Sequence, residues 1–287
     1  MPRILIRLGD MGSLTPLLLG LSSIGGEPEK LRRIVDGRVV VVTGASRGIG
    51  LEMARRLTCV GATVVGVART AEALEQMESQ TDLFHPLVGD LRDCEWAEGA
   101  GRRVVEEWGT PAVLISNAGH SIHRTLAESE DRFHDVARTA GVNYLGAVAL
   151  SLPILQAMRR QVSGHLISVS TTNVDFPLPA WSAYTASKAA YETWLRCVAP
   201  ELRGGNVAVT SVHLPRVATA MSAPTSGLYH LPELSVDQAA DVLCRALVAR
   251  PRFIQPWWAR VGAVVAAGMP TSVERIWEFA LTAGVRP

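Results

Sequence analysis

The fold of this 287-residue chain is decided by the stretch Val39-Val40-Val41-Val42-Thr43-Gly44-Ala45-Ser46-Arg47-Gly48-Ile49-Gly50. Four β-branched residues in a row predict a strand that is buried on both faces, as in a parallel sheet. The segment 52–58 then has the pattern of a helix, which Gly61 ends. A strand, a glycine turn and a helix in this order form a corner that binds phosphate groups, because glycines let the backbone approach closely and the helix N-terminus supplies free N–H groups.

The end of the second predicted strand, 62–68, indicates which dinucleotide this corner would bind. A site that prefers NAD usually places Asp or Glu there to hold the ribose 2′-hydroxyl. This chain has Arg69 instead, and Arg47 in the glycine turn adds a second positive charge. Guanidinium groups bind phosphate well, so the pair favours NADP(H). Two solvated arginines without this role are the alternative.

Strands and helices alternate through the rest of the chain. The predicted helices are 71–80, 94–108, 131–151, a long helix through 184–188 to 203, and 235–249; the predicted strands are 84–88, 111–116, 164–171, 206–213 and 252–255. Alternation without a hairpin signal predicts one doubly wound parallel sheet, a Rossmann-like α/β fold. Every strand then ends along one edge, where the cofactor lies. Asp90 at such an end is the candidate for holding the adenine, whereas Asp93 starts the next helix.

Composition excludes several classes of function. Lys and Arg number 28 against 27 Asp and Glu, and no basic stripe suggests nucleic acid. The four cysteines form no Cys-x-x-Cys pair, so the sequence holds no evident metal site and suits a reduced, cytoplasmic protein. No further ligand accompanies His120 and His123 in a motif, so structural or surface histidines are the better interpretation.

Three regions follow from these patterns. Residues 1–36 form an N-terminal extension, interpreted as packed on the outside of the main domain, with contact to a membrane or a partner as the alternative; its longest early apolar run is too short to cross a bilayer. Residues 37–256 form the α/β domain, whose loop 216–234 is long enough to be a lid or binding loop. Residues 257–287 form an apolar helical tail. We expect it to cover the substrate cleft or a subunit interface, and a membrane-surface helix is the alternative.

Tyr184 and Lys188 are spaced so that both lie on one face of a helix. An unperturbed tyrosine titrates near pH 10, and a fixed positive charge beside it favours the phenolate. Such a pair can exchange a proton with a substrate oxygen, although the same spacing also occurs on ordinary half-buried helices.

Taken together, residues 37–256 resemble the short-chain dehydrogenase/reductase family. The motifs that carry the resemblance are Thr43-Gly44-x-x-x-Gly48-x-Gly50, Asp90, Asn117-Ala118-Gly119, Asn143, Tyr184-x-x-x-Lys188 and Pro215 to Thr219. The resemblance implies that Tyr184 is the general acid, that Lys188 lowers its pKa and holds the nicotinamide ribose, and that Asn143 anchors a water chain to Lys188. The cofactor contacts it implies, beside Tyr184 and Lys188, are Gly44, Ser46, Arg47, Gly48, Ile49, Gly50, Arg69, Asp90, Leu91, Asn117, Ala118, Gly119, Pro215, Val217 and Thr219.

Three positions depart from the family pattern. The catalytic serine expected thirteen residues before Tyr184 is Thr171, with Ser170 beside it; consecutive strand residues point to opposite faces, so we favour Thr171 and keep Ser170 as the alternative. Ser116 replaces an asparagine, with an effect expected on turn packing only. Arg216 replaces a glycine and is either a tolerated loop substitution or a cation that favours an acidic or phosphorylated substrate.

The loop 214–225 and the stretch 234–256 are similar to actinobacterial short-chain reductases that act on fatty-acyl and related lipids. This resemblance implies an NADP(H)-dependent oxidoreductase that interconverts a carbonyl and an alcohol on a lipophilic substrate. A steroid-type alcohol dehydrogenase and a non-catalytic dinucleotide-binding sensor are the alternatives. The family also implies a homodimer or homotetramer, and peripheral contact with a membrane stays open.

Overall fold

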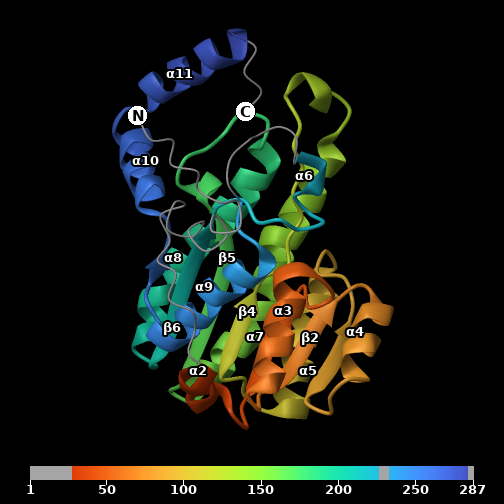
Figure 1. The fold of residues 1–287 in the computed structure, drawn as a ribbon. Coiled ribbons are helices and arrows are strands. Elements are labelled where there is room, and N and C mark those ends of the chain that lie inside the picture. Colours follow the sequence, from red (N-terminus) through yellow and green to blue (C-terminus); the bar gives the residue numbers. More distant parts are fainter. Residues whose placement is uncertain (1–27, 226–232, 284–287) are drawn as a thin grey trace, which may run out of the picture.

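The computed structural model describes residues 28–225 and 233–283, and its centre is a parallel sheet of seven strands in the order β3-β2-β1-β4-β5-β6-β7 (Figure 1). The strands are β1 Val39–Thr43, β2 Thr63–Ala68, β3 Phe84–Val88, β4 Val113–Ser116, β5 Gly164–Thr171, β6 Val207–Leu214 and β7 Phe253–Ile254. This confirms the single doubly wound sheet that the sequence predicts.

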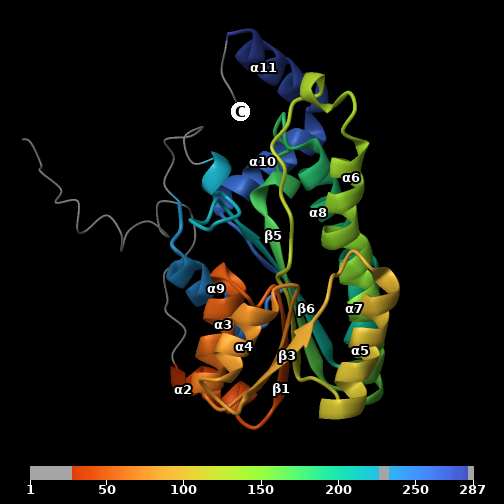
Figure 2. The same cartoon turned by 90° about the vertical axis from the view of Figure 1, so that its right-hand side faces the viewer.

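Helices cover both faces of the sheet. They are α2 Pro28–Val35, α3 Gly48–Cys59, α4 Ala71–Glu78, α5 Cys94–Trp108, α6 Phe133–Ala140, α7 Gly146–Arg160, α8 Ser182–Arg203, α9 Val236–Ala249, α10 Trp257–Gly268 and α11 Pro270–Thr282. Figure 2 shows α3 and α9 on one side of the sheet and α5, α7 and α8 on the other. The sheet is therefore the middle of three layers, as expected for right-handed crossovers in a parallel sheet.

The valine run explains why the first strand is central. Val40 and Val42 point into the core on the α3 and α9 side, whereas Val41 points into the core under α5 and α7. All three side chains are fully buried. Because successive side chains of a strand point to opposite faces, only an uninterrupted apolar run fills both layers.

The prediction of one helix over 131–151 is wrong in two respects: the helix is interrupted inside this range, and it continues beyond residue 151. The chain passes through a π-helical turn, Gly141–Leu145, and α7 then continues through Pro153 to Arg160. Proline removes one helical hydrogen bond. Here α7 packs closely on α5, since a Cβ on Gly101 would lie 2.5 Å from the Leu150 carbonyl oxygen, and this packing holds the helix together beyond the proline.

The continuous helical segment Phe133–Arg160 is also long and apolar enough to cross a membrane. Half of its most apolar stretch is buried inside the fold. Its apolar side chains Leu150, Ile154 and Met158 are fully buried in the core between the sheet and α5. Core packing therefore accounts for the composition of this segment.

The two terminal regions differ in how firmly they are packed. Leu31 and Val35 of α2 are buried in the core beside α9, and residues 1–27 lie outside the described residues. In contrast, α10 and α11 extend beyond the edge of the sheet (Figure 1), and in them only Ala259 and Val273 are buried. Phe176 joins these helices to the body, since its ring lies 5.9 Å from that of Trp277.

Candidate functional site

The predicted site residues lie at the carboxyl ends of the strands or on the elements that follow them. The glycine turn after β1 carries Gly44 to Gly50; Arg69 follows β2; Asp90 and Leu91 follow β3; Asn117, Ala118 and Gly119 follow β4; Thr171 ends β5; Pro215, Val217 and Thr219 follow β6. The chain order of the sheet reverses between β1 and β4. In open α/β sheets this switch point is where a crevice forms and a ligand binds.

The glycine turn has room for a ligand only because it lacks side chains. Gly44 and Gly48 have φ of 71° and 55°, which is left-handed backbone that favours glycine. A Cβ on Gly50 would lie 2.2 Å from the Gly44 carbonyl oxygen. Arg47, the N-cap residue of α3, makes no side-chain capping bond, and the first turn of α3 has no acidic residue. These features fit the diphosphate of a dinucleotide at the helix N-terminus.

A hydrogen-bonded joint between β1 and β4 fixes the floor of this crevice. The Thr43 hydroxyl oxygen accepts from the backbone N–H groups of Asn117 and Ala118, both at 2.9 Å. The Asn117 amide donates to the Thr43 carbonyl oxygen, also at 2.9 Å. Thr43 and Asn117 therefore lock the two strand ends where the chain order reverses.

The charged residues after β2 and β3 form one cluster. Arg92 donates from its backbone and side chain to the Asp90 carboxylate, and Arg69 Nη1 lies 3.9 Å from the same carboxylate. Burial alone would raise the pKa of Asp90, but the hydrogen bonds from Arg92 hold it below its usual range. The Arg69 side chain is 59% exposed, so it is held loosely and faces solvent where a ribose phosphate would be accessible.

Lys188 and Asn143 meet beside Gly119. A Cβ on Gly119 would lie 3.3 Å from Asn143 Oδ1 and 3.4 Å from Lys188 Nζ, so a side chain at this position would press on both groups. Lys188 Nζ donates to the Val169 carbonyl oxygen at 2.9 Å, and burial lowers the pKa of Lys188 to about 8. Asn143 holds the His120 backbone, accepting from its N–H and donating to its carbonyl oxygen, and among the described residues it makes no direct hydrogen bond to Lys188.

Tyr184 and Thr171 face each other across the end of β5. The Thr171 side chain interacts with the Tyr184 hydroxyl, and this interaction lowers the pKa of Tyr184. Burial has the larger effect and raises the pKa of Tyr184 to about 12. The phenol is therefore protonated at neutral pH, with a buried ammonium group one helical turn away.

Ser170, the alternative to Thr171, points the other way. Its hydroxyl is buried and makes no hydrogen bond within residues 28–225 and 233–283. The two residues pair with consecutive positions of β6, His213 and Leu214, so they alternate across the sheet. The structure thus brings only the Thr171 hydroxyl to Tyr184.

Two contact residues, Ser187 and Trp181, were not singled out from the sequence. The Ser187 hydroxyl accepts from the Asn143 amide at 2.9 Å, and the π-helical turn aims Asn143 at it. Trp181 lies 5.8 Å from the Tyr184 ring and 5.0 Å from the His123 ring, between ring centroids. The one signal in the sequence that could have indicated Ser187 is its position next to Lys188. The contact between Trp181 and His123 joins segments far apart in the chain, so the sequence contains no local signal for it.

Arg216 forms bonds within the loop 216–234, which begins at this residue. Its guanidinium donates to the carbonyl oxygens of Thr225 and Ser222, and its Nε lies 3.0 Å from Glu233. Val217 and Leu234 also pair as a short bridge. These bonds close the base of the loop 216–234, of which residues 226–232 lie outside the described residues, and they favour the structural interpretation of Arg216.

Ser116, the other departure, binds the Tyr191 hydroxyl, which also lies 3.0 Å from the Ser151 hydroxyl. Tyr191 is buried between the sheet and α7. Ser116 therefore contributes to packing at the end of β4, as the sequence predicts.

Comparisons with known proteins agree with this geometry. The family model described as short chain dehydrogenase matches residues 38–227. A fatty acyl-CoA reductase of Acinetobacter baylyi is 38% identical over 243 residues, which are 83% of this chain and 82% of the relative. A fatty acyl-CoA reductase of Mycobacterium tuberculosis is 36% identical over 229 residues, 77% of each chain.

Solved structures show the same architecture. A short-chain dehydrogenase from Burkholderia cenocepacia, crystallised in complex with NADP, superposes with a TM-score of 0.72 at 25% identity and covers 84% of this chain and 98% of that one. The match of the family model, the relatives and the crevice at the β1 and β4 switch point lead to one conclusion. The chain belongs to the short-chain dehydrogenase family and is an oxidoreductase of that family.

Proposed function

We propose that this protein is an NADP(H)-dependent reductase that converts a carbonyl group on a lipophilic substrate to an alcohol, with Tyr184 as the general acid. The observation that carries the proposal is the meeting of the Tyr184 and Thr171 hydroxyl groups beside the buried Lys188, next to a glycine turn that fits a dinucleotide. A bound nicotinamide would supply the hydride.

The side chains divide the proton chemistry among them. Tyr184, protonated at neutral pH, donates its proton to the carbonyl oxygen as negative charge develops there. Thr171 holds the phenol in place and supplies a second hydroxyl to that oxygen. The Lys188 ammonium stabilises the phenolate that remains, and in a buried site this attraction is stronger than in water. Asn143 positions the His120 backbone beside Lys188.

Replacing Thr171 tests which hydroxyl acts. We expect Thr171→Ala to lower kcat by about 10- to 100-fold, because one hydroxyl to the reacting oxygen and to Tyr184 is lost. Ser170→Ala removes a buried hydroxyl with no described partner, so kcat stays within about twofold and the protein becomes slightly more stable. Steady-state kinetics and thermal unfolding of both variants measure this; the reverse ranking of kcat would assign the role to Ser170.

Replacing Arg69 tests the cofactor preference. The exposed guanidinium at the end of β2 supports binding of a ribose 2′-phosphate, which Arg47 would assist. We expect Arg69→Asp to weaken NADPH binding by 10-fold or more, because an acid there repels the phosphate, and to leave NADH binding unchanged or tighter. Tryptophan fluorescence titration measures both affinities, with Arg103→Gln on α5 as a control. Equal effects on NADPH and NADH would contradict the assignment.

The lipophilic substrate is supported by the surroundings of Tyr184 and by the names of two relatives as fatty acyl-CoA reductases. His123 and Trp181 form an aromatic wall against the Tyr184 ring. Phe176, five residues after Thr171, packs against Trp277 and lies near Gly262. The exposed side chains of α10 and α11 include Trp257, Val264, Ile276 and Phe279. An apolar chain could therefore lie between Tyr184 and these helices.

A turnover screen with substrates of rising chain length tests the proposal. We test aldehydes, which one hydride and one proton convert to alcohols, and acyl-CoA thioesters, which one hydride and one proton convert to an aldehyde and free CoA thiol. We expect kcat/KM with NADPH to increase with chain length in both series, since each buried CH₂ adds about 0.8 kcal/mol. Higher kcat/KM for sterol alcohols than for any acyl compound would favour the steroid dehydrogenase instead. Tight NADPH binding without turnover of any carbonyl or alcohol would favour the non-catalytic sensor.

A further inference from the structure

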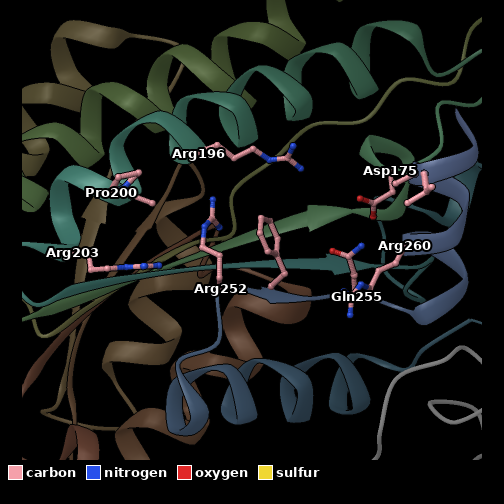
Figure 3. Close-up of a pocket in the computed structure, with 11 residues that line it drawn as sticks. Asp175, Arg196, Pro200, Arg203, Arg252, Gln255 and Arg260 are labelled. Carbon is pink, nitrogen blue, oxygen red and sulfur yellow. The ribbon is translucent and has the colours of Figure 1, made fainter. Parts of the chain in front are cut away.

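A cavity lies at the edge of the sheet beyond β6, and its lining contains none of the predicted cofactor or catalytic residues. Its volume is about 610 Å³, within the range of small-molecule sites. Figure 3 shows that its walls come from α8, from β7 and from α10. The cavity is lined by Asp175, Arg196, Ala199, Pro200, Arg203, Arg252, Phe253, Gln255, Arg260, Ala263 and Val264. None of these residues belongs to the predicted catalytic or cofactor set.

Four of the lining residues are arginines, and few acids oppose them. The carboxylate of Glu192 is shared, because Arg196 Nε lies 3.4 Å and Arg252 Nη2 lies 3.6 Å from its Oε1. Asp175, the other acid, lies 2.7 Å from His213 Nδ1. His213 Nε2 also lies 3.6 Å from Glu192 Oε2, so the Glu192 carboxylate interacts with this histidine as well as with the two arginines.

Arg252 is held at the centre of the cluster. Its guanidinium stacks on the Phe253 ring at 4.2 Å, its Nη1 donates to the Ser211 hydroxyl at 3.0 Å, and its buried Nη2 faces Glu192 at 3.6 Å without a hydrogen bond. Burial lowers the pKa of Arg252, and Arg196 and Arg203 lower it further, which Glu192 partly opposes. Arg252 is therefore a fixed, half-buried cation whose charge favours an anion in the cavity.

The remaining two arginines add positive charge without described acidic partners. Within residues 28–225 and 233–283, no ion pair of Arg203 or Arg260 is found, and both side chains are exposed at the rim. A neighbouring cavity of about 370 Å³ shares Arg203 and Arg252 and continues the basic surface toward Arg250. The cavity therefore carries more positive than negative charge, together with an apolar wall from Phe253, Ala263 and Val264.

We propose that this arginine-lined cavity binds a phosphate ester of a small molecule. Guanidinium groups bind phosphate through paired N–H donors, and four of them line this one cavity. The phosphate could belong to the carrier group of a thioester substrate, an assignment that rests on the proposed function, or to a separate phosphorylated metabolite. Both have the same chemistry at the cavity, and the experiment distinguishes them.

The test uses the full chain saturated with NADP⁺, so that the glycine turn and Arg69 are already occupied. Isothermal titration calorimetry with pyrophosphate should then show one further site. We expect Arg203→Gln and Arg260→Gln each to weaken this binding by about tenfold and the double variant by about 100-fold, whereas Arg103→Gln binds like the unmodified protein. No binding of pyrophosphate, or equal binding by the double variant, would overturn the proposal.

Kinetics of the double variant identify the source of the phosphate. If the phosphate belongs to the substrate, KM for a long-chain acyl-CoA rises by tenfold or more, while KM for the aldehyde of equal chain length stays constant. If KM for both stays constant while pyrophosphate binding is lost, the ligand is a separate phosphorylated metabolite. Because the calorimetry does not require turnover, failure of the proposed reductase activity leaves the phosphate site independently testable.

Discussion

Tyr184→Phe is expected to lower kcat for carbonyl reduction by about 10²- to 10⁴-fold, the usual contribution of a positioned general acid. The substitution removes one oxygen and leaves the ring, so the contacts with Trp181 persist. The loss arises because the aliphatic hydroxyl of Thr171 is a much weaker acid than the phenol of Tyr184. Thr171 therefore cannot replace the tyrosine as proton donor. NADPH affinity should change by less than about fivefold, since most predicted cofactor contacts lie on the strand ends. Stopped-flow or steady-state absorbance of NADPH measures the rate.

Tyr191→Phe is the matched control for this experiment. Tyr191 lies two turns further along α8 and is buried, and its hydroxyl binds Ser151 and Ser116 rather than a substrate. Its loss should cost about 1 kcal/mol of stability and leave kcat within about twofold. If Tyr184→Phe kept more than a tenth of the activity, another group would have to be the proton donor.

Lys188→Met is expected to lower kcat by about 100-fold or more and to change how stability depends on pH. We expect the rate to fall because the phenolate left after proton transfer would lose the positive charge of Lys188, one helical turn away. Methionine has a similar length and fills the same buried space, so the fold should persist. The exposed Lys30 on α2 provides the control, and Lys30→Met should leave kcat unchanged.

The stability effect follows from the pKa of Lys188, which burial lowers from 10.5 to about 8. Between these values the unfolded chain binds more protons than the folded one, so the free energy of unfolding rises with pH through this window. Tyr184 acts in the opposite direction, but only from pH 10 to about 12. Between pH 8 and 10 the unmodified apoprotein should therefore gain about 2 kcal/mol relative to Lys188→Met.

Urea unfolding of the apoprotein at several pH values measures this difference. The Lys30→Met variant, which removes an exposed lysine of α2, serves as the control and should follow the unmodified protein. Parallel curves for the unmodified protein and Lys188→Met would show that Lys188 does not titrate in this window. The kinetic result would then have to be explained without a depressed lysine pKa.

The sequence by itself predicted the features that depend on neighbours in the chain. The valine run, the glycine turn and the helix after it predicted the first corner of the sheet, and alternation predicted its parallel order. Strand 164–171 and helix 94–108 have the predicted bounds, the latter because Asp93 caps it by accepting from the Trp96 N–H. Ser235 likewise caps α9 in a capping box with Gln238. Such signals are local, so one stretch of sequence contains them.

Other features were decided by contacts between distant segments. The sequence left Thr171 and Ser170 as alternatives, and the pairing of β5 with β6 and the position of α8 set which hydroxyl meets Tyr184. The helix through Pro153 persists because α5 packs against it. The sequence also left open whether Arg216 serves the loop or a substrate. Its partners Thr225 and Glu233, which lie at separate points of the loop, favour the first interpretation.

The arginine-lined cavity shows the same principle most clearly. Arg196, Arg252 and Arg260 come from α8, from the start of β7 and from α10, and no spacing in the chain connects them. Local sequence fixes the conformation of each element, because backbone hydrogen bonds and side-chain periodicity act over a few residues. The charge and shape of a cavity depend on how these elements pack, and for this protein only the tertiary structure determined them.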